Sequence, residues 1–157
     1  MNRLNHGMNR RHQFQFERFG SAYHLKIKNA QDLEAVLALD EAHWVATTGP
    51  TATLNCDPVL LRLIDTDNDG RLRAEEIKDA IRFLLENLLD KSGIAPGNTR
   101  LNLDEVNRHS EIGGRIFSSA TKIRNRLEIP EAFVTLEQVR AIKTEVQEGG
   151  LDEAGIV

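Results

Sequence analysis

The residues best suited to chemistry are acidic side chains that alternate along residues 65–76, Asp-Thr-Asp-Asn-Asp-Gly-Arg-Leu-Arg-Ala-Glu-Glu. Asp65, Asp67 and Asp69 stand at positions 1, 3 and 5 of this segment, and Glu76 stands at position 12. A hard cation of the size of Ca²⁺ takes six to eight oxygen ligands at about 2.3–2.6 Å. A short loop supplies them when carboxylates alternate along it and the backbone turns sharply between them, so this segment predicts a cation site.

Two further residues complete the predicted ligand set. Gly70 at position 6 allows the left-handed backbone conformation that the turn requires. Arg71 at position 7 contributes its backbone carbonyl, so the identity of its side chain matters little. Glu76 can use both of its oxygens, which suits Ca²⁺ better than the smaller Mg²⁺. We therefore expect bound Ca²⁺, with the ligands Asp65, Asp67, Asp69, Arg71 and Glu76.

This segment resembles the calcium loop of the EF-hand superfamily at every patterned position. The resemblance covers residues 58–88, because the patterns on both sides of the loop predict flanking helices. It implies that Leu72, at position 8, forms a short β-bridge with a partner loop. Residues 25–50 are also similar to the N-terminal part of large uncharacterised bacterial proteins that carry one such loop. This second resemblance implies no activity.

Two other interpretations of the loop are weaker. A simple polar turn would cluster four carboxylates without a cation, and these charges would repel one another. Dockerins share the Asp-rich loop, but as a family they carry two calcium repeats and generally lack the helix before the loop. Arg71 and Arg73 place two positive charges within the loop, and Arg73 stands at position 9, where many family members have an acidic or polar group. We therefore expect a dissociation constant of roughly 10⁻⁶ to 10⁻⁴ M.

A second segment follows the same pattern without its acids. When residues 127–138 are aligned with the loop, Val134 falls at position 8 and Gln138 at position 12. Leu127 and Ile129 then occupy positions 1 and 3, where their side chains cannot bind a metal ion. We expect residues 104–148 to form a degenerate EF-hand that pairs with the first, with an unrelated helical hairpin as the alternative.

The hydrophobic pattern predicts a mainly α fold: a paired EF-hand helical domain with a small N-terminal strand-helix-strand appendage. The appendage, residues 21–50, should contain a strand over 23–28, a helix over 30–41 and a strand over 43–47. The calcium-competent EF-hand, residues 51–90, should contain helices over 58–64 and 74–90, the second forming the spine of the core. We expect a linker over 91–103, a short helix capped by Asp104, and helices over 112–127 and 137–148.

The two ends of the sequence have different compositions. Residues 1–20 are basic, and we expect a disordered arm or leader there, although the alternation of Phe14 and Phe16 with glutamines allows a short edge strand. Residues 149–157 follow the last predicted helix without a closing element, and we expect a truncated tail. The chain is therefore expected to be the N-terminal part of a longer protein.

The composition limits the classes of function. The 157 residues carry a net charge of −4, made up of +5 over residues 1–28 and −9 over the rest. Because nucleic-acid binding requires a basic surface, we expect no nucleic-acid partner. No apolar run is long enough to span a membrane, and the absence of a signal-peptide pattern favours a cytoplasmic protein. The single cysteine, Cys56, excludes an intramolecular disulfide and is expected to be a small buried thiol.

The sequence thus predicts a calcium-binding module that is not an enzyme. Sensor EF-hands expose a Met-rich groove, but both methionines here, Met1 and Met8, lie in the basic N-terminal segment, which favours a structural or regulatory role. A protein partner or a downstream domain of the same chain is expected. Two alternatives remain open: a regulatory N-terminal piece of an enzyme whose catalytic domain lies beyond Val157, or a helical interaction module without calcium affinity.

Overall fold

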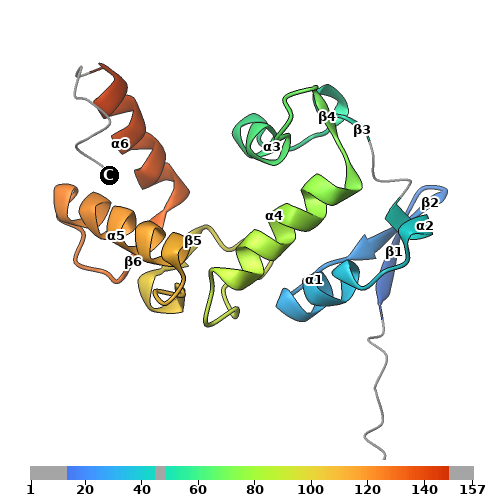
Figure 1. Ribbon diagram of the computed structural model, residues 1–157, viewed down its shortest axis with the longest axis horizontal. Coiled ribbons are helices and arrows are strands. Elements are labelled where there is room, and N and C mark those ends of the chain that lie inside the picture. The colour runs from blue at the N-terminus through green and yellow to red at the C-terminus, as the bar shows by residue number, and fades with distance from the viewer. Residues whose placement is uncertain (1–13, 45–48, 149–157) are drawn as a thin grey trace, which may run out of the picture.

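The computed structural model describes residues 14–44 and 49–148, and helices dominate this part of the chain (Figure 1). The strands form three antiparallel two-stranded sheets: one is a hairpin, and the other two connect segments that are distant in sequence. The mainly α class is therefore confirmed. In chain order the elements are β1 (Gln15–Phe19), β2 (Ala22–Lys26), α1 (Ala30–Leu37), α2 (Glu41–Trp44), β3 (Gly49–Pro50), the 3₁₀ turn η2 (Thr51–Thr53), α3 (Pro58–Ile64), β4 (Arg71–Leu72), α4 (Ala74–Glu86), β5 (Arg100–Asn102), the 3₁₀ turn η3 (Leu103–Glu105), α5 (Glu111–Arg126), β6 (Phe133–Thr135) and α6 (Leu136–Glu148).

The described part of the N-terminal segment forms a hairpin. Strands β1 and β2 pair across a turn in which Gly20 has a φ of +61°, and the ammonium of Lys26 lies 2.9 Å from the carboxylate of Glu17. The disordered arm predicted for residues 1–20 is therefore wrong for residues 15–19. The edge strand indicated by the alternating phenylalanines is the correct alternative there. Residues 1–13 lie outside the described residues.

The second strand predicted over 43–47 is wrong at residues 43 and 44, which lie in helix α2. Helix α1 begins as predicted, with the Asn29 side chain accepting from the Asp32 N–H at 3.0 Å. His43 and Trp44 then end α2, and residues 45–47 lie outside the described residues. The helical turn buries Trp44 beneath α4, where the ammonium of Lys78 lies 5.2 Å from the ring centroid. This tertiary contact outweighs the β propensity of the segment.

The rest of the described chain repeats one order of elements. The first module (residues 49–86) runs β3, η2, α3, β4, α4, and the second module (residues 100–148) runs β5, η3, α5, β6, α6. In each module the first strand pairs with the second, so that Gly49 lies opposite Leu72 and Leu101 lies opposite Val134. The predicted bridge between Leu72 and a partner loop at Val134 is therefore wrong. Pairing within a module closes a shorter length of chain, which costs less entropy.

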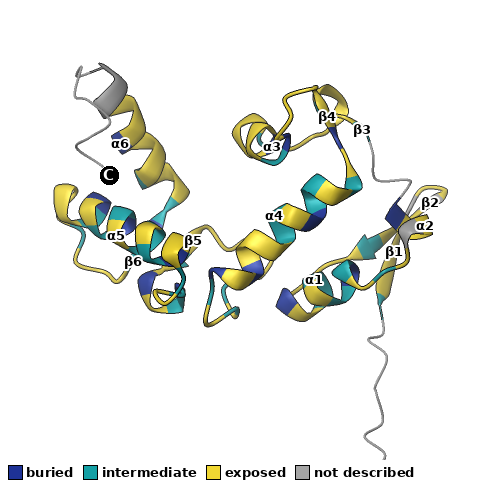
Figure 2. Cartoon of the chain, viewed as in Figure 1, coloured by how far each residue is buried: buried dark blue, intermediate teal, exposed yellow. Residues whose placement is uncertain are grey.

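The two modules differ in how much apolar surface they bury. In the second, one cluster of buried side chains joins η3, α5, β6 and α6, and it comprises Leu103, Ala120, Ile123, Val134 and Ile142. In the first, Leu61, Leu72 and Leu85 are buried, whereas Phe83 and Leu84 on α4 are 49% and 39% exposed. Figure 2 shows exposed positions along most of α3 and a mixture of exposed, intermediate and buried positions along α4. Helix α4 is therefore only partly the core spine that its apolar stripe predicted.

The junction between the modules lies at the C-terminal end of α4. The helix ends at Glu86, four residues before the predicted end, and the side chain of the buried Asn87 donates to the Phe83 carbonyl at 2.8 Å. The Asn87 carbonyl accepts from the Asn107 N–H at 2.9 Å, which ties this end of α4 to the second module. The linker predicted over 91–103 is wrong at its end, because β5 occupies 100–102. Asp104 lies inside η3 and does not cap it.

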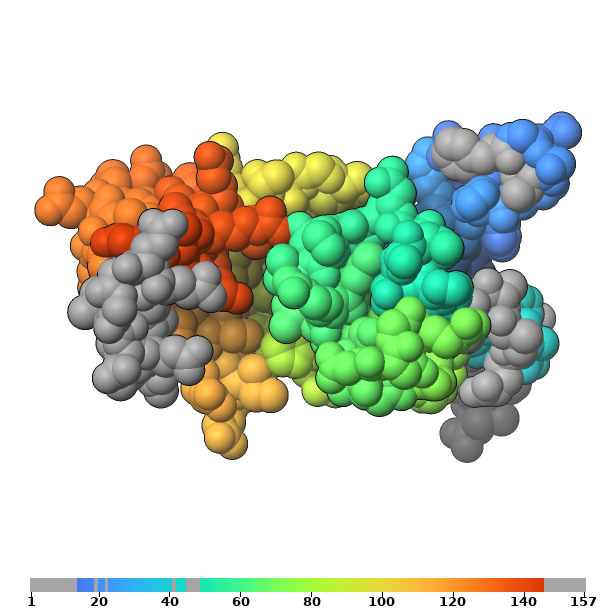
Figure 3. Space-filling model, turned by 90° about the horizontal axis from the view of Figure 1, so that it is seen from above, coloured from blue at the N-terminus to red at the C-terminus, as the bar shows by residue number. Residues whose placement is uncertain are grey.

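Viewed from above, the second module lies beside the first, with α6 next to the start of α3 (Figure 3). There the guanidinium of Arg140 forms an ion pair with Asp57. Within the described ranges, no helix is both long and apolar enough to cross a membrane.

Candidate metal centre

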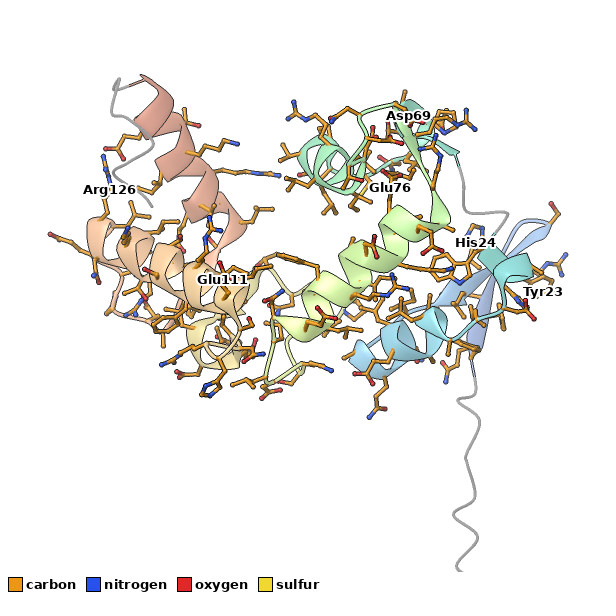
Figure 4. The ribbon with its side chains drawn as sticks, in the orientation of Figure 1. Tyr23, His24, Asp69, Glu76, Glu111 and Arg126 are labelled. Carbon is orange, nitrogen blue, oxygen red and sulfur yellow. The ribbon has the colours of Figure 1, made fainter. Side chains whose placement is uncertain are left out.

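The acidic segment forms the connection between α3 and α4, and the two helices fix its ends (Figure 4). Asp57 caps α3 by accepting the N–H groups of Val59 and Leu60 at 2.8 and 3.2 Å, as its position before Pro58 predicted. Helix α3 ends at Ile64, so Asp65 begins the first loop (residues 65–76). Glu76 lies in the first turn of α4 and faces back toward that loop.

The turn in the middle of the first loop has the predicted geometry. Gly70 has a φ of +76°, which confirms the expected left-handed conformation, and Asn68 has a φ of +55°. The Gly70 carbonyl accepts two hydrogen bonds from Thr51, from its N–H at 2.9 Å and from its hydroxyl at 3.1 Å. The neighbouring strand β3 and turn η2 therefore hold this turn in place from outside the loop.

The three aspartates of the first loop accept hydrogen bonds from its own backbone. Asp65 is buried, and its two carboxylate oxygens accept the N–H groups of Asp69 at 3.1 Å and Gly70 at 3.0 Å. Asp67 accepts the Asp69 N–H at 3.2 Å, and Asp69 accepts the Arg71 N–H at 2.9 Å. These bonds fold the loop around its carboxylates.

Glu76 joins the two ends of the first loop. One of its oxygens accepts the N–H and the hydroxyl of Thr66 at 2.8 and 3.2 Å, and the other accepts the Arg73 N–H at 2.9 Å. The bond from Arg73 is the main cause that lowers the pKa of Glu76 below its usual value, with further contributions from Thr66. Glu76 is therefore a carboxylate at neutral pH, the form that binds cations.

Three of the five predicted ligands already lie within reach of one ion. Asp65, Asp67 and Glu76 each offer a carboxylate oxygen, and these three atoms lie within 4.8 Å of one another. The donors are all hard oxygens, and they come from both ends of the loop, as a cation of the size of Ca²⁺ requires. The residues present therefore fit such an ion. Asp69 lies outside this group of three, and Arg71 lies on β4 with its backbone paired to Pro50.

The position of Arg73 is a feature that the loop pattern did not predict. Its guanidinium forms ion pairs with both Asp67 and Asp69, and these two carboxylates raise the pKa of Arg73. The sequence indicated only that its charge would weaken cation binding. Thr51 and Thr66 were also missed, since Thr66 is not a patterned position and Thr51 reaches the loop only through strand pairing.

The second loop (residues 127–138) has the same place in its module but a different lining. Leu127 and Ile129 stand at positions 1 and 3, and the left-handed residue is Glu128 at position 2, with a φ of +51°. Gln138 accepts the Thr135 N–H at 2.8 Å, as Glu76 accepts that of Arg73 in the first module. The two position-12 side chains therefore have the same backbone role, although only one is charged.

Among the other reactive groups, Cys56 is exposed, so the expectation of a buried thiol is wrong. Comparison of the chain with family models, curated proteins and solved structures gives no significant match. The argument for function therefore depends on the geometry of the first loop and its surroundings.

Proposed function

We propose that this chain binds Ca²⁺ through an EF-hand-like loop at residues 65–76 and that it is not an enzyme. The observation that carries the proposal is the convergence of Asp65, Asp67 and Glu76 on one point, around a turn closed by Gly70. Asp69 and the Arg71 carbonyl would complete an all-oxygen ligand set. Bound Ca²⁺ would neutralise charge that the carboxylates otherwise bring together in a small volume.

The role that we propose is structural or regulatory and not that of a sensor. Glu76 already joins the two ends of the loop through Thr66 and Arg73, so that ion binding would reinforce an existing connection between α3 and α4. We expect the fluorescence of a dye that binds exposed apolar surface to be equal with Ca²⁺ and with chelator. A strong gain of signal with Ca²⁺ would instead indicate a sensor.

The proposal is tested by calorimetric titration of the whole chain with CaCl₂. We expect wild-type binding with a dissociation constant of roughly 10⁻⁶ to 10⁻⁴ M. Glu76→Gln should weaken binding at least about a hundredfold, since even the loss of a group that only supports a ligand costs roughly 10- to 100-fold. The matched control is Glu86→Gln, which removes the same charge from the far end of α4 and should leave affinity within about twofold of wild type. Absence of heat at millimolar Ca²⁺, or equal affinity of wild type and Glu76→Gln, contradicts the proposal.

A second candidate is a helical interaction module that acts without Ca²⁺. The observation in its favour is the exposure of large apolar side chains, 73% for Leu63 on α3 and 56% for Leu136 on α6. Sedimentation velocity in chelator and in Ca²⁺ separates the two candidates. Self-association that is independent of Ca²⁺ and is abolished by Leu63→Ser would favour the interaction module.

A further inference from the structure

The guanidinium of Arg73 lies among the carboxylates that we expect to bind the cation. One terminal nitrogen pairs with Asp67 and the other with Asp69, so the two arms of the guanidinium engage two different predicted ligands. The Arg73 side chain is half exposed. Arginine has only hydrogen-bond donors and stays charged at all relevant pH values, so its guanidinium can act as an organic cation here.

We infer that Arg73 is an internal competitor of Ca²⁺, a cation built into the loop that sets the affinity of the site. This inference rests on the proposed function. The guanidinium occupies one oxygen of Asp67 and one of Asp69, so fewer lone pairs of these carboxylates are left for a metal ion and the two cations compete for the same groups. Ca²⁺ binding would therefore move the Arg73 side chain into water, which its half-exposed position allows.

The expected size of the competition follows from the exposure of the two ion pairs. An exposed ion pair shifts an equilibrium by between about 1.4-fold and about fivefold. Two pairs lost together therefore predict a change in affinity of about tenfold. The backbone N–H of Arg73, which donates to Glu76 at 2.9 Å, does not depend on the side chain, so replacing the guanidinium should leave that part of the loop intact.

Arg71 provides a matched control within the same loop. It carries the same charge two residues earlier, and its side chain is exposed on β4. Its bond to Asp69 comes from its backbone N–H and survives substitution. Arg71→Gln and Arg73→Gln therefore remove equal charge, but only Arg73→Gln removes the two ion pairs. The ratio of their affinities isolates the direct competition from the general effect of charge.

The experiment is calorimetric titration of wild type, Arg71→Gln and Arg73→Gln with CaCl₂, at low salt and again in 0.5 M NaCl. We expect Arg71→Gln to tighten binding by up to about threefold and Arg73→Gln by about tenfold. The ratio between the variants should shrink in high salt, because exposed ion pairs are screened. In chelator, Arg73→Gln should lower the melting temperature more than Arg71→Gln, because its carboxylates then lack their counter-ion.

The outcomes separate this inference from the proposed function. Wild-type binding with equal affinities for the two variants overturns the role of Arg73 and leaves the calcium site in place. Binding by Arg73→Gln when wild type does not bind supports the inference in its strongest form, with Arg73 blocking the site. Failure of all three proteins to bind at millimolar Ca²⁺ overturns both the inference and the proposed function.

Discussion

The first and second loops occupy equivalent places in their modules, and much of their framework is shared. Each is flanked by two helices and carries a buried apolar residue at position 8, Leu72 or Val134, each 4% exposed. Each position-8 residue pairs with a strand that precedes a 3₁₀ turn. Each position-12 side chain accepts the N–H of the residue at position 9. Positions 1 and 3 are aspartates in the first loop and apolar residues in the second. The shared framework therefore does not depend on acidic side chains at these positions.

The differences lie in the side chains that line the loops and in the cores beneath them. Position 1 is the buried carboxylate of Asp65 in the first loop and the apolar Leu127 in the second. Helix α3 has 7 residues and leaves Leu63 exposed, whereas α5 has 16 residues and packs in a continuous apolar cluster. The comparison indicates that the second module is held by apolar packing and the first depends more on polar groups around its loop.

The largest expected difference between the modules comes from the two position-8 residues. Leu72→Ala should destabilise the protein by about 2–5 kcal/mol and also weaken Ca²⁺ binding, because Leu72 is the buried residue of β4, the strand within the loop that pairs with β3. Val134→Ala should cost about 2 kcal/mol through the core of the second module and leave Ca²⁺ affinity unchanged. Urea unfolding and calorimetric titration of both variants measure these effects. An equal loss of affinity in both would show that the two loops are coupled.

Metal addition should act on one loop only. At a Ca²⁺ concentration of 100 times the dissociation constant, binding stabilises the folded state by about 2.7 kcal/mol. Amide hydrogen exchange should therefore slow across residues 65–76 and stay unchanged across residues 127–138. The Glu76→Gln protein is the control: with at least about a hundredfold weaker affinity it gains at most about 0.4 kcal/mol at this concentration, so its first loop should slow far less than that of the wild type. Equal slowing in both loops of the wild type would contradict a local effect of Ca²⁺ and show that binding stabilises both modules together.

Two glycines should respond to alanine with opposite signs. Gly70→Ala places a side chain at a φ of +76° in open space, so backbone strain alone should destabilise the first module by about 1–2 kcal/mol. Gly114→Ala, in α5, meets only the Arg108 carbonyl at 3.5 Å and should stabilise the second module by up to about 1 kcal/mol. Thermal unfolding in chelator tests both changes. Destabilisation by Gly114→Ala would mean that α5 packs more tightly at this point than its geometry shows.

The smallest effect is expected where the two modules meet. Arg140 of α6 is the first cause of a lowered pKa for Asp57, followed by the N–H groups at the start of α3. A carboxylate whose pKa is lowered by folding contributes stability above its unfolded pKa of about 3.8, and the contribution is lost as the pH falls below that value. Asp57→Asn keeps the cap but removes the charge, so its melting temperature should fall less between pH 6 and pH 3 than that of wild type. Equal pH dependence in both proteins would contradict this contribution.

Local features of the fold could be predicted from the sequence where short-range chemistry decides them. The caps at Asn29 and Asp57 and the left-handed turn at Gly70 all have the predicted geometry, because each depends on neighbours a few residues away. The predicted ends of α4 and of the linker are wrong. Asn87 is bonded to Asn107 of the second module, and β5 pairs with β6, and neither contact can be read from neighbouring residues. The sequence did not predict the N-terminal hairpin, because the polar residues of β1 have the same composition as a disordered arm.

The sequence alone determined which residues can bind a cation and in what order they lie, because alternating carboxylates, a glycine and a glutamate act within twelve positions. Only the tertiary structure decided which strand supports the loop, since Gly49 and Leu72 meet across 23 residues of chain. It also decided that the guanidinium of Arg73 lies between Asp67 and Asp69, which depends on how the loop folds back on itself. Spacing determines the chemistry that a short loop can perform, whereas the energies of long-range packing and pairing determine its neighbours.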